Sequence, residues 1–169
     1  AIYFANFDDL DTDNITYDAT NTDTVDTWQP AAILSLFKYE LKSNENSFTT
    51  AVQTSRDNGT TFFEQTLAIS LKKQDQAMHK NIKLLAYGRP RIIVRTMTDQ
   101  FFLMGLAQGC DTTAGEISSG AALGDFNGYK LTFVASEVLP ANFIDVSSEA
   151  ALKTAFATGA GEDATIVTT

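Results

Sequence analysis

Five of the chain's ten glycines lie between residues 109 and 128, and a glycine-rich loop can hold a phosphate when a strand precedes it and a helix follows it. The phosphate-binding loop also needs a lysine followed by serine or threonine, and no Gly-Lys-Ser or Gly-Lys-Thr sequence occurs in the chain. After this stretch Tyr129, Leu131 and Phe133 recur at every second position, as in a strand. The pattern predicts a flexible loop that ends in an Asn-Gly turn and continues into a strand.

The segment Asp9–Asn14, with the sequence DLDTDN, resembles the start of a calcium-binding loop. An EF-hand loop needs glycine at its sixth place and glutamate at its twelfth, where the chain has Asn14 and Thr20. The interpretation we favour is a solvated acidic segment, and calcium binding is the alternative. No metal ion and no cofactor is expected.

A nucleophilic site is disfavoured because the chain has one cysteine, Cys110, and one histidine, His79. The two fall in different predicted elements, so a Cys–His pair is not expected. A single cysteine also excludes a disulfide within the chain. With no other catalytic constellation in the sequence, we expect that the protein is not an enzyme.

Composition indicates one domain over residues 1–169, because 169 residues with 44% hydrophobic content can bury a single core. The formal net charge of −9 disfavours binding to DNA or to an anionic membrane. The longest apolar run, at 101–107, is much shorter than the roughly 20 residues that cross a bilayer. The first residues lack the basic start of a secretory signal, so no membrane partner is expected.

Alternating apolar residues predict three successive antiparallel strands, at 33–42, 47–56 and 60–72, the last two joined by an Asn58–Gly59 turn. A helix is expected at about 75–87, capped by Asp75 and ended by Gly88, with Met78, Ile82 and Leu85 on its apolar side. A hairpin at 91–104 turns at 98–100, and a strand covers 129–138. A short helix is expected at 147–157, capped by Asp145 or Ser147.

Three segments are poor in core residues. Residues 1–30 hold seven aspartates and neither lysine nor arginine, so we expect an acidic N-terminal arm with one short strand near Ile2–Phe7. The others are the loop at 109–127 and a mobile C-terminal tail at 158–169. Arg91 and Arg95 share one face of a strand, and a solvated edge or a pairing with a neighbour's acids are both open. The fold class is mainly β (α+β), an antiparallel β-sandwich or partly open barrel at 33–143 with one flanking α-helix.

The block at 84–143 resembles the tail tube (major tail) proteins of tailed bacteriophages and prophages. The resemblance is carried by the strand pair RIIVRT and FFLMGL, the turn GCDTTAG, the loop SGAALGDFNGY, the strand KLTFVASE and the following PANF. It covers about 60 residues, and none of these motifs is a chemical signature.

The resemblance implies a virion structural protein whose copies close into a ring, probably of six, around one inner β-barrel. Rings stack into a tube through which DNA passes at ejection without specific binding, and other virion tail proteins are further partners. The expected location is the virion tail, assembled in the host cytoplasm. An acidic channel wall would repel phosphates, and the net charge of −9 agrees with it.

On this reading, candidate residues of the channel wall lie on polar strand faces, and candidate ring-to-ring contacts lie in the arm at 1–30 and in the glycine-rich loop. The wall candidates are Lys38, Glu40, Lys42, Glu64, Thr66 and Ser70. The loop candidates are Gly109, Gly115, Gly120, Gly124, Asp125, Asn127 and Gly128. The alternatives are a head-to-tail connector or other ring protein of a phage, and a calcium-dependent extracellular β-sandwich binding module.

Overall fold

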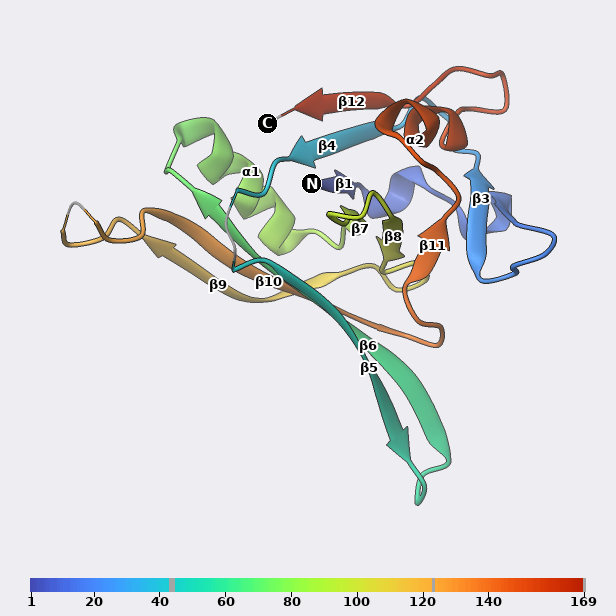
Figure 1. Ribbon diagram of the computed structural model, residues 1–169, viewed down its shortest axis with the longest axis horizontal. Helices are drawn as coiled ribbons and strands as arrows, with labels where there is room; N and C mark the ends of the chain where they lie inside the picture. Colours follow the sequence, from blue (N-terminus) through green and yellow to red (C-terminus); the bar gives the residue numbers. More distant parts are fainter. Residues whose placement is uncertain (43–44, 123, 169) are drawn as a thin grey trace.

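The computed structural model describes residues 1–42, 45–122 and 124–168, which form two β-sheets and two α-helices (Figure 1). The larger sheet has eight strands in the order β12-β4-β1-β7-β8-β11-β3-β2, and the smaller has four in the order β5-β6-β10-β9. The predicted mainly β fold with a flanking helix is confirmed. The larger sheet consists of β1 (Ile2–Ala5), β2 (Ile15–Tyr17), β3 (Thr24–Trp28), β4 (Ser35–Tyr39), β7 (Arg91–Arg95), β8 (Phe101–Met104), β11 (Asn142–Ile144) and β12 (Thr165–Thr168). The smaller consists of β5 (Ser47–Ser55), β6 (Thr60–Lys72), β9 (Asp111–Ser118) and β10 (Gly128–Glu137).

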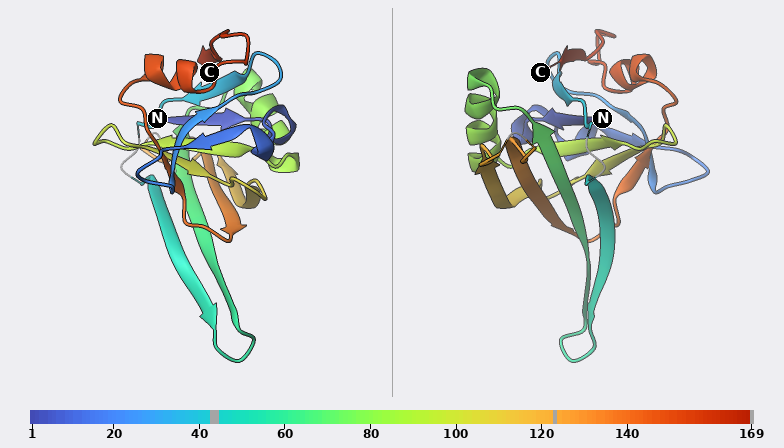
Figure 2. Two further views of the ribbon diagram at one scale, coloured as in Figure 1. Left: turned by 90° about the vertical axis from the view of Figure 1, so that its right-hand side faces the viewer. Right: turned by 60° about the vertical axis from the view of Figure 1, so that its left-hand side comes forward.

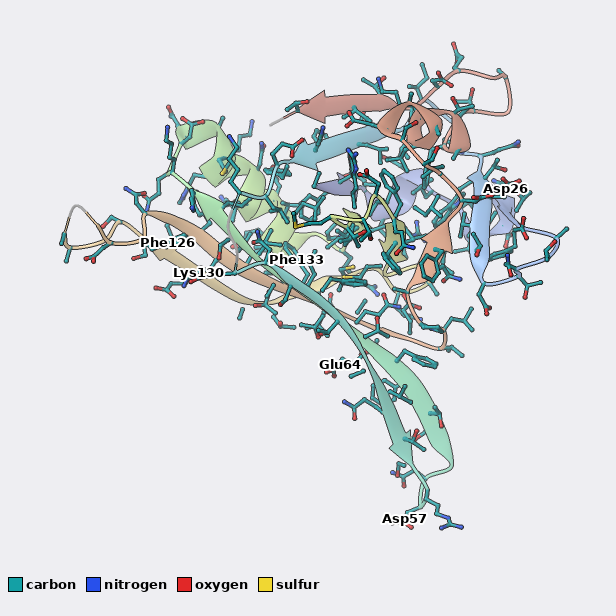
Figure 3. All side chains as sticks on the ribbon, viewed as in Figure 1. Asp26, Asp57, Glu64, Phe126, Lys130 and Phe133 are labelled. Carbon is teal, nitrogen blue, oxygen red and sulfur yellow. The ribbon has the colours of Figure 1, made fainter. Side chains whose placement is uncertain are left out.

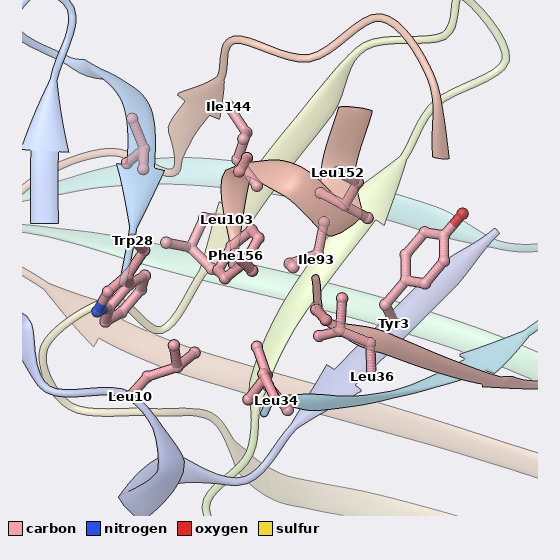
Figure 4. Close-up of a cluster of buried hydrophobic side chains, with 14 of the residues drawn as sticks. Tyr3, Leu10, Trp28, Leu34, Leu36, Ile93, Leu103, Ile144, Leu152 and Phe156 are labelled. Carbon is pink, nitrogen blue, oxygen red and sulfur yellow. The ribbon is translucent and has the colours of Figure 1, made fainter. Parts of the chain in front are cut away.

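The larger sheet is buried on both faces. One apolar cluster joins it to the short helix α2 (Glu149–Ala155) and includes Tyr3, Trp28 and Phe156 (Figure 4). The other cluster joins the two sheets and the helix α1 (Gln76–Tyr87), and includes Phe4 and Phe133. Tyr3 and Phe4 are neighbours in β1 that enter different clusters, because successive side chains of a strand point to opposite faces. β1 is therefore a central strand of the core.

The first 30 residues thus differ from the solvated arm that their composition predicts. β1 lies between β4 and β7, and all four of its residues are buried. Trp28, at the end of β3, is fully buried and donates from Nε1 to the carbonyl oxygen of Asp11 at 2.7 Å. Two 3₁₀ turns, Phe7–Asp9 and Thr12–Asn14, connect β1 to β2. The average acidity of the segment conceals a few apolar residues that are enough to fix it on the sheet.

The expected run of three successive strands is also different. The run at 33–42 contributes β4 to the larger sheet, where it pairs with β1 and β12 and not with β5. β5 and β6 form the predicted hairpin, with Gly59 of its Asn58–Gly59 turn at φ 63°. β7 and β8 form the second predicted hairpin, turning at 98–100 with Asp99 at φ 58°. Local turn signals located both hairpins, whereas sheet membership depends on contacts distant in the sequence.

The C-terminal segment, expected as a mobile tail, ends in a paired strand. β12 runs parallel to β4. The backbone N–H of Thr165 donates to the carbonyl oxygen of Leu34 at 2.8 Å, and Ala164 is buried. The strand-forming residues at 165–168 therefore complete an edge of this chain's own larger sheet.

The helices agree with the sequence in position more than in their ends. The side chain of Asp75 accepts a hydrogen bond from the N–H of Ala77 at the start of α1, as predicted, and Ile82 is buried against the second cluster. Gly88 follows α1 at φ −87°, so it is not the left-handed residue that often ends a helix. The cap of α2 is Ser148, whose hydroxyl accepts from the N–H of Ala151, and not Asp145 or Ser147.

Arg91 is a buried cation that fixes the first segment to β7. Its side chain donates to the carbonyl oxygens of Phe7 at 2.6 Å, Leu10 at 2.5 Å and Leu106 at 3.0 Å. Its guanidinium carbon lies 4.2 Å from the Phe7 ring centroid and 4.9 Å from that of Trp28. Burial lowers the pKa of Arg91. The solvated edge considered for both arginines is therefore wrong for Arg91.

Replacing Arg91 by methionine is expected to lower the free energy of unfolding by about 3 kcal/mol, because three buried carbonyl oxygens lose a charged donor. Urea unfolding at pH 7 measures this difference. The matched control is Arg95→Met, on the same strand face, where the lost partner is Asp99 at 2.6 Å in a partly exposed ion pair. The control is expected to cost less than about 1 kcal/mol, and equal losses in the two variants would contradict the anchoring role of Arg91.

Candidate assembly surface

The β5–β6 hairpin extends well beyond the rest of the molecule, and we call its outer part, residues 49–62, the arm (Figures 1 and 2). Every residue from Thr49 to Phe62 except Ser55 is exposed. The hairpin pairs in one unbroken register from Ser47 opposite Ala68 to Ser55 opposite Thr60. An isolated two-stranded hairpin is marginally stable in water, so the arm depends on how its base is held.

Two buried polar side chains hold the base of the arm. Gln65 in β6 accepts from the N–H of Gly105 at 3.1 Å and donates to the carbonyl oxygen of Leu139 at 3.2 Å. Glu137 in β10 accepts from the N–H groups of Ala107 and Gln108 at 2.9 and 2.8 Å. Because both side chains satisfy backbone groups of neighbouring loops, they fix the direction in which the hairpin leaves the body. The sequence did not single out either residue, since each is one polar position within an alternating strand.

The smaller sheet has one apolar face and one face rich in hydroxyl groups. The apolar face carries Leu67, Leu131 and Phe133 against the larger sheet. Lys130 and Phe133 lie on opposite sides of β10 (Figure 3). We call the side of Lys130 the hydroxyl face, because most of its residues are serine, threonine or alanine. By strand register its hydroxyl residues are Ser47, Thr49, Ser55, Thr60, Thr66, Ser70, Ser118, Thr132 and Ser136.

Both edges of the smaller sheet end in long strands, which we call its free edges. Within the described residues, β5 pairs only with β6, and β9 only with β10. β5 spans nine residues, SFTTAVQTS, without a charge or a proline, whereas exposed edge strands in monomers commonly carry charges or prolines that prevent further pairing. β9 lies in the expected loop at 109–127, of which residues 111–118 are a strand. Its threonines and its full register with β10 account for this difference.

Three of the six wall candidates lie on the hydroxyl face and three do not. Glu64, Thr66 and Ser70 belong to β6, and Ser70 is largely covered, with its N–H donating to the side-chain oxygen of Asn46 at 2.8 Å. Lys38 belongs to β4 in the larger sheet, and Glu40 and Lys42 follow that strand. The structure therefore does not bring all six to one surface.

Lys38 takes part in an ion-pair cluster that joins β4 to α2. Its Nζ lies 2.7 Å from Glu149 Oε2 and 2.8 Å from Glu40 Oε1, and the hydroxyl of Tyr3 donates to Glu149 at 3.2 Å. The hydrogen bond from Lys38 lowers the pKa of Glu149 and that of Glu40, and the two carboxylates raise the pKa of Lys38. This cluster stabilises the packing of α2 on the larger sheet.

The glycine candidates fall into different environments. Gly109 is buried with φ 75°, and Gly115 lies within β9. Gly120, at φ 70°, and Gly124 belong to the turn between β9 and β10. In that turn Asp125 accepts from the N–H groups of Ala121 and Ala122 at 2.8 Å each, which lowers its pKa. Asn127, also in this turn, accepts at its carbonyl oxygen from the N–H of Lys73 at 2.9 Å.

Gly128, the first residue of β10, is required for packing and is not a flexible joint. A Cβ atom at this position would lie 2.0 Å from the carbonyl oxygen of Leu71, while nothing lies within 4 Å of a Cβ at Gly124. The close approach brings β10 against β6 at the pair Gly128 and Lys72. Only the turn at 119–127 therefore fits the adaptable loop that the glycines predict.

Other kinds of site have little support in the described residues. A groove of about 540 Å³ between α1 and β1 is lined by apolar side chains such as Phe4, Phe37 and Leu85, with Asp8 and Arg89 at its rim. Among residues 1–42, 45–122 and 124–168 no three His, Cys, Asp or Glu side chains gather in a way that could bind a metal ion. Within the same residues no helix has the length and apolar character needed to span a membrane.

No family model, curated protein or solved structure matches the chain. The functional argument therefore depends on the two free edges, the hydroxyl face and the arm.

Replacing Gly128 by valine is expected to lower the free energy of unfolding by at least about 3 kcal/mol, because the backbone of β10 must move away from β6. Gly124→Val, in open space, is the control and should change it by less than about 1 kcal/mol. Chemical denaturation of both variants measures the difference. A Gly128→Val protein as stable as the parent would show that the two strands do not approach so closely.

Replacing Glu149 by glutamine should lower the free energy of unfolding by about 1 kcal/mol at pH 7, where the partly exposed ion pair with Lys38 is intact. Because the folded-state pKa of Glu149 is lowered, its stabilisation is present above the unfolded pKa of about 4.3 and is lost as pH falls through the folded value. The difference between parent and variant should therefore close in acid. Glu162→Gln, at an exposed position after α2, is the control, and a difference that is independent of pH would exclude the ion pair as its cause.

Proposed function

We propose that this protein is a tail tube subunit of a bacteriophage virion, whose copies join through the free edges of the smaller sheet into rings that stack around a channel for DNA. The observation that carries the proposal is the free edge of β5, a nine-residue strand without charge or proline. Unpaired N–H and C=O groups along such a strand are a template for another chain. Closure into a barrel is the arrangement that leaves no edge.

The smaller sheet has the strand count that such closure requires. Its four strands are all antiparallel neighbours, so β9 runs opposite to β5 and can add to the β5 of the next copy as a further antiparallel strand. Repetition of this one contact around a rotation axis is a heterologous interface, which forms a ring when the rotation closes.

The hydrogen-bonding groups of the two free edges are also in phase. The N–H of Ser70 points toward the β5 side, and N–H groups alternate between the two edges of a strand. Even-numbered residues of β6 therefore bond β5, and Phe48, Thr50 and Val52 turn their N–H groups outward. The same alternation across β10 turns Gly115 and Ile117 of β9 outward. At both edges the outward groups belong to residues on the apolar face, so pairing keeps the faces of adjacent copies aligned.

Closure with the apolar face against the larger sheet would place the hydroxyl face toward the channel. Its charged residues are Glu64, Lys72, Glu116 and Lys130, which balance one another. DNA binding requires clustered cations that neutralise phosphates, and this surface has none. Such a wall suits a duplex that must pass through without being held.

The ends of the smaller sheet suit contact between successive rings. Gly128 pairs with Lys72 and with Ser118 at one end of β6, while the arm lies at the other end. The turn at 119–127 and the arm are therefore at opposite ends of the same strands. When rings stack along the strand direction, the arm of one ring reaches toward the turn of the next. This is the arrangement expected of a tube that grows by identical steps.

Electron microscopy of the purified protein at high concentration, with its mass in solution measured in parallel, tests the proposal. Stacked rings with an open central channel are expected. A monomer that forms neither rings nor tubes at any concentration, alone or on added tail tips, would contradict it.

Replacing Thr50 by proline should abolish ring formation while keeping the fold, because Thr50 directs its N–H away from β6 and proline removes only an outward donor. Ala51→Pro is the control, since Ala51 directs its N–H toward β6 and its loss breaks the hairpin itself. The mass in solution and the far-ultraviolet circular dichroism of both variants separate the two effects. Normal rings formed by a folded Thr50→Pro protein would exclude β5 as the joining edge.

A further inference from the structure

We propose that β9 of one copy pairs with β5 of the next in a single register, which places Ile117 opposite Phe48 and Glu116 opposite Thr49. The inference rests on the proposed ring and adds the residues that specify it. Two independent constraints lead to the same register, the tilt that a closed barrel imposes and the apolar side chains exposed at the two edges.

The existing pairings define one row across the sheet. Ser47 lies opposite Ala68, Ala68 opposite Thr132, and Thr132 opposite Ala114. If the next copy were added without displacement along the strands, Ala114 would lie opposite its Ser47. Barrels cannot close in this way when their strands tilt, because each copy is then displaced along the strand direction relative to its neighbour. The displacement must be an even number of residues, since an odd number would reverse the faces.

The size of the displacement follows from barrel geometry. Four strands span about 19 Å across the sheet, and a displacement of four residues is about 14 Å along the strand. The resulting tilt is about 35°, within the usual range of 35–45°, whereas two residues give about 20° and six give about 47°. With four residues, the regular part of β9 from Ala114 to Ser118 lies opposite Ala51 to Ser47, all within β5. With two residues, β9 would extend past the start of β5.

The side chains favour the same register. Ile117 is 52% exposed on the apolar face of β9. A displacement of four residues places it opposite Phe48, which is half-buried and contacts Phe102 with ring centroids 5.8 Å apart. Pairs of an aromatic and a β-branched residue are among the favourable cross-strand neighbours. A displacement of six residues would instead place Ile117 opposite Thr50, and the isoleucine would leave this aromatic cluster uncovered.

Disulfide cross-linking tests the register directly. Thr49 and Glu116 are exposed on the hydroxyl face and form a non-hydrogen-bonded pair in the proposed contact, with Cα atoms about 4.5 Å apart, within disulfide range. Within one chain β5 and β9 are separated by β6 and β10, about 14 Å, so a disulfide between them must join two copies. Cys110 is fully buried and burial raises the pKa of its thiol, so it does not compete.

The variant Thr49→Cys with Glu116→Cys, oxidised with diamide, is expected to give a ladder on a non-reducing gel that ends at a closed ring. The matched variants keep Glu116→Cys and combine it with Ala51→Cys or Gln53→Cys, the partners in displacements of six and eight residues. Each should cross-link at least tenfold more slowly. Faster cross-linking in either matched variant would overturn the register.

The outcomes also separate this inference from the proposed function. Rings visible by microscopy without a Thr49–Glu116 cross-link would overturn the β9–β5 register and leave the ring itself in place. A chain that remains monomeric and gives no cross-link in any of the three variants would overturn both. Cross-linking between two singly substituted proteins mixed in solution should yield dimers only, which confirms that the contact joins different copies.

Discussion

The alternation of side chains and hydrogen bonds across the four-stranded sheet is the constraint on which the rest of the structure depends. Ten consecutive residues of β10 pair with β6 without interruption, so each strand has one face committed to the apolar core and one that is not. The same alternation assigns every backbone donor to one edge or the other. The composition of the hydroxyl face and the phase of the two free edges are therefore consequences of one register.

An extended hairpin is useful in assembly only if its direction is fixed before a partner arrives. Ordering a mobile segment at an interface costs conformational free energy that reduces the affinity. In this chain the β5–β6 hairpin continues directly from a core strand, and Gln65 and Glu137 bind the neighbouring loop through buried hydrogen bonds. Buried polar groups satisfied in this way specify one arrangement of the backbone. The base of the arm is thus held by the monomer's own core.

Local signals in the sequence predicted both hairpins, α1 and the mainly β class. Asn58–Gly59 and the residues at 98–100 mark their turns through backbone preferences that act within a few residues. The sequence could not assign β1 or β4 to a sheet, because pairing partners up to about 90 residues away decide this. It also missed β9, since a threonine- and glycine-containing segment resembles a loop until β10 is present beside it. Of the wall candidates, Glu64, Thr66 and Ser70 followed from period-two alternation within one strand, whereas Lys38 was grouped with them only because β4 was expected to adjoin β5.

The distribution of charge changes the physical account of how DNA would pass. The net charge of −9 suggests an acidic wall, but aspartates concentrate in the first 30 residues, which lie at the larger sheet, and the hydroxyl face has balanced charges. Repulsion by a charged wall falls off within about 8–10 Å at physiological salt. A wall of hydroxyl and methyl groups avoids adhesion in another way, because it offers no ion pairs to phosphate and exchanges its weak hydrogen bonds readily with water. On this account the acidity of the chain serves its outer surface, and the absence of clustered cations serves the channel.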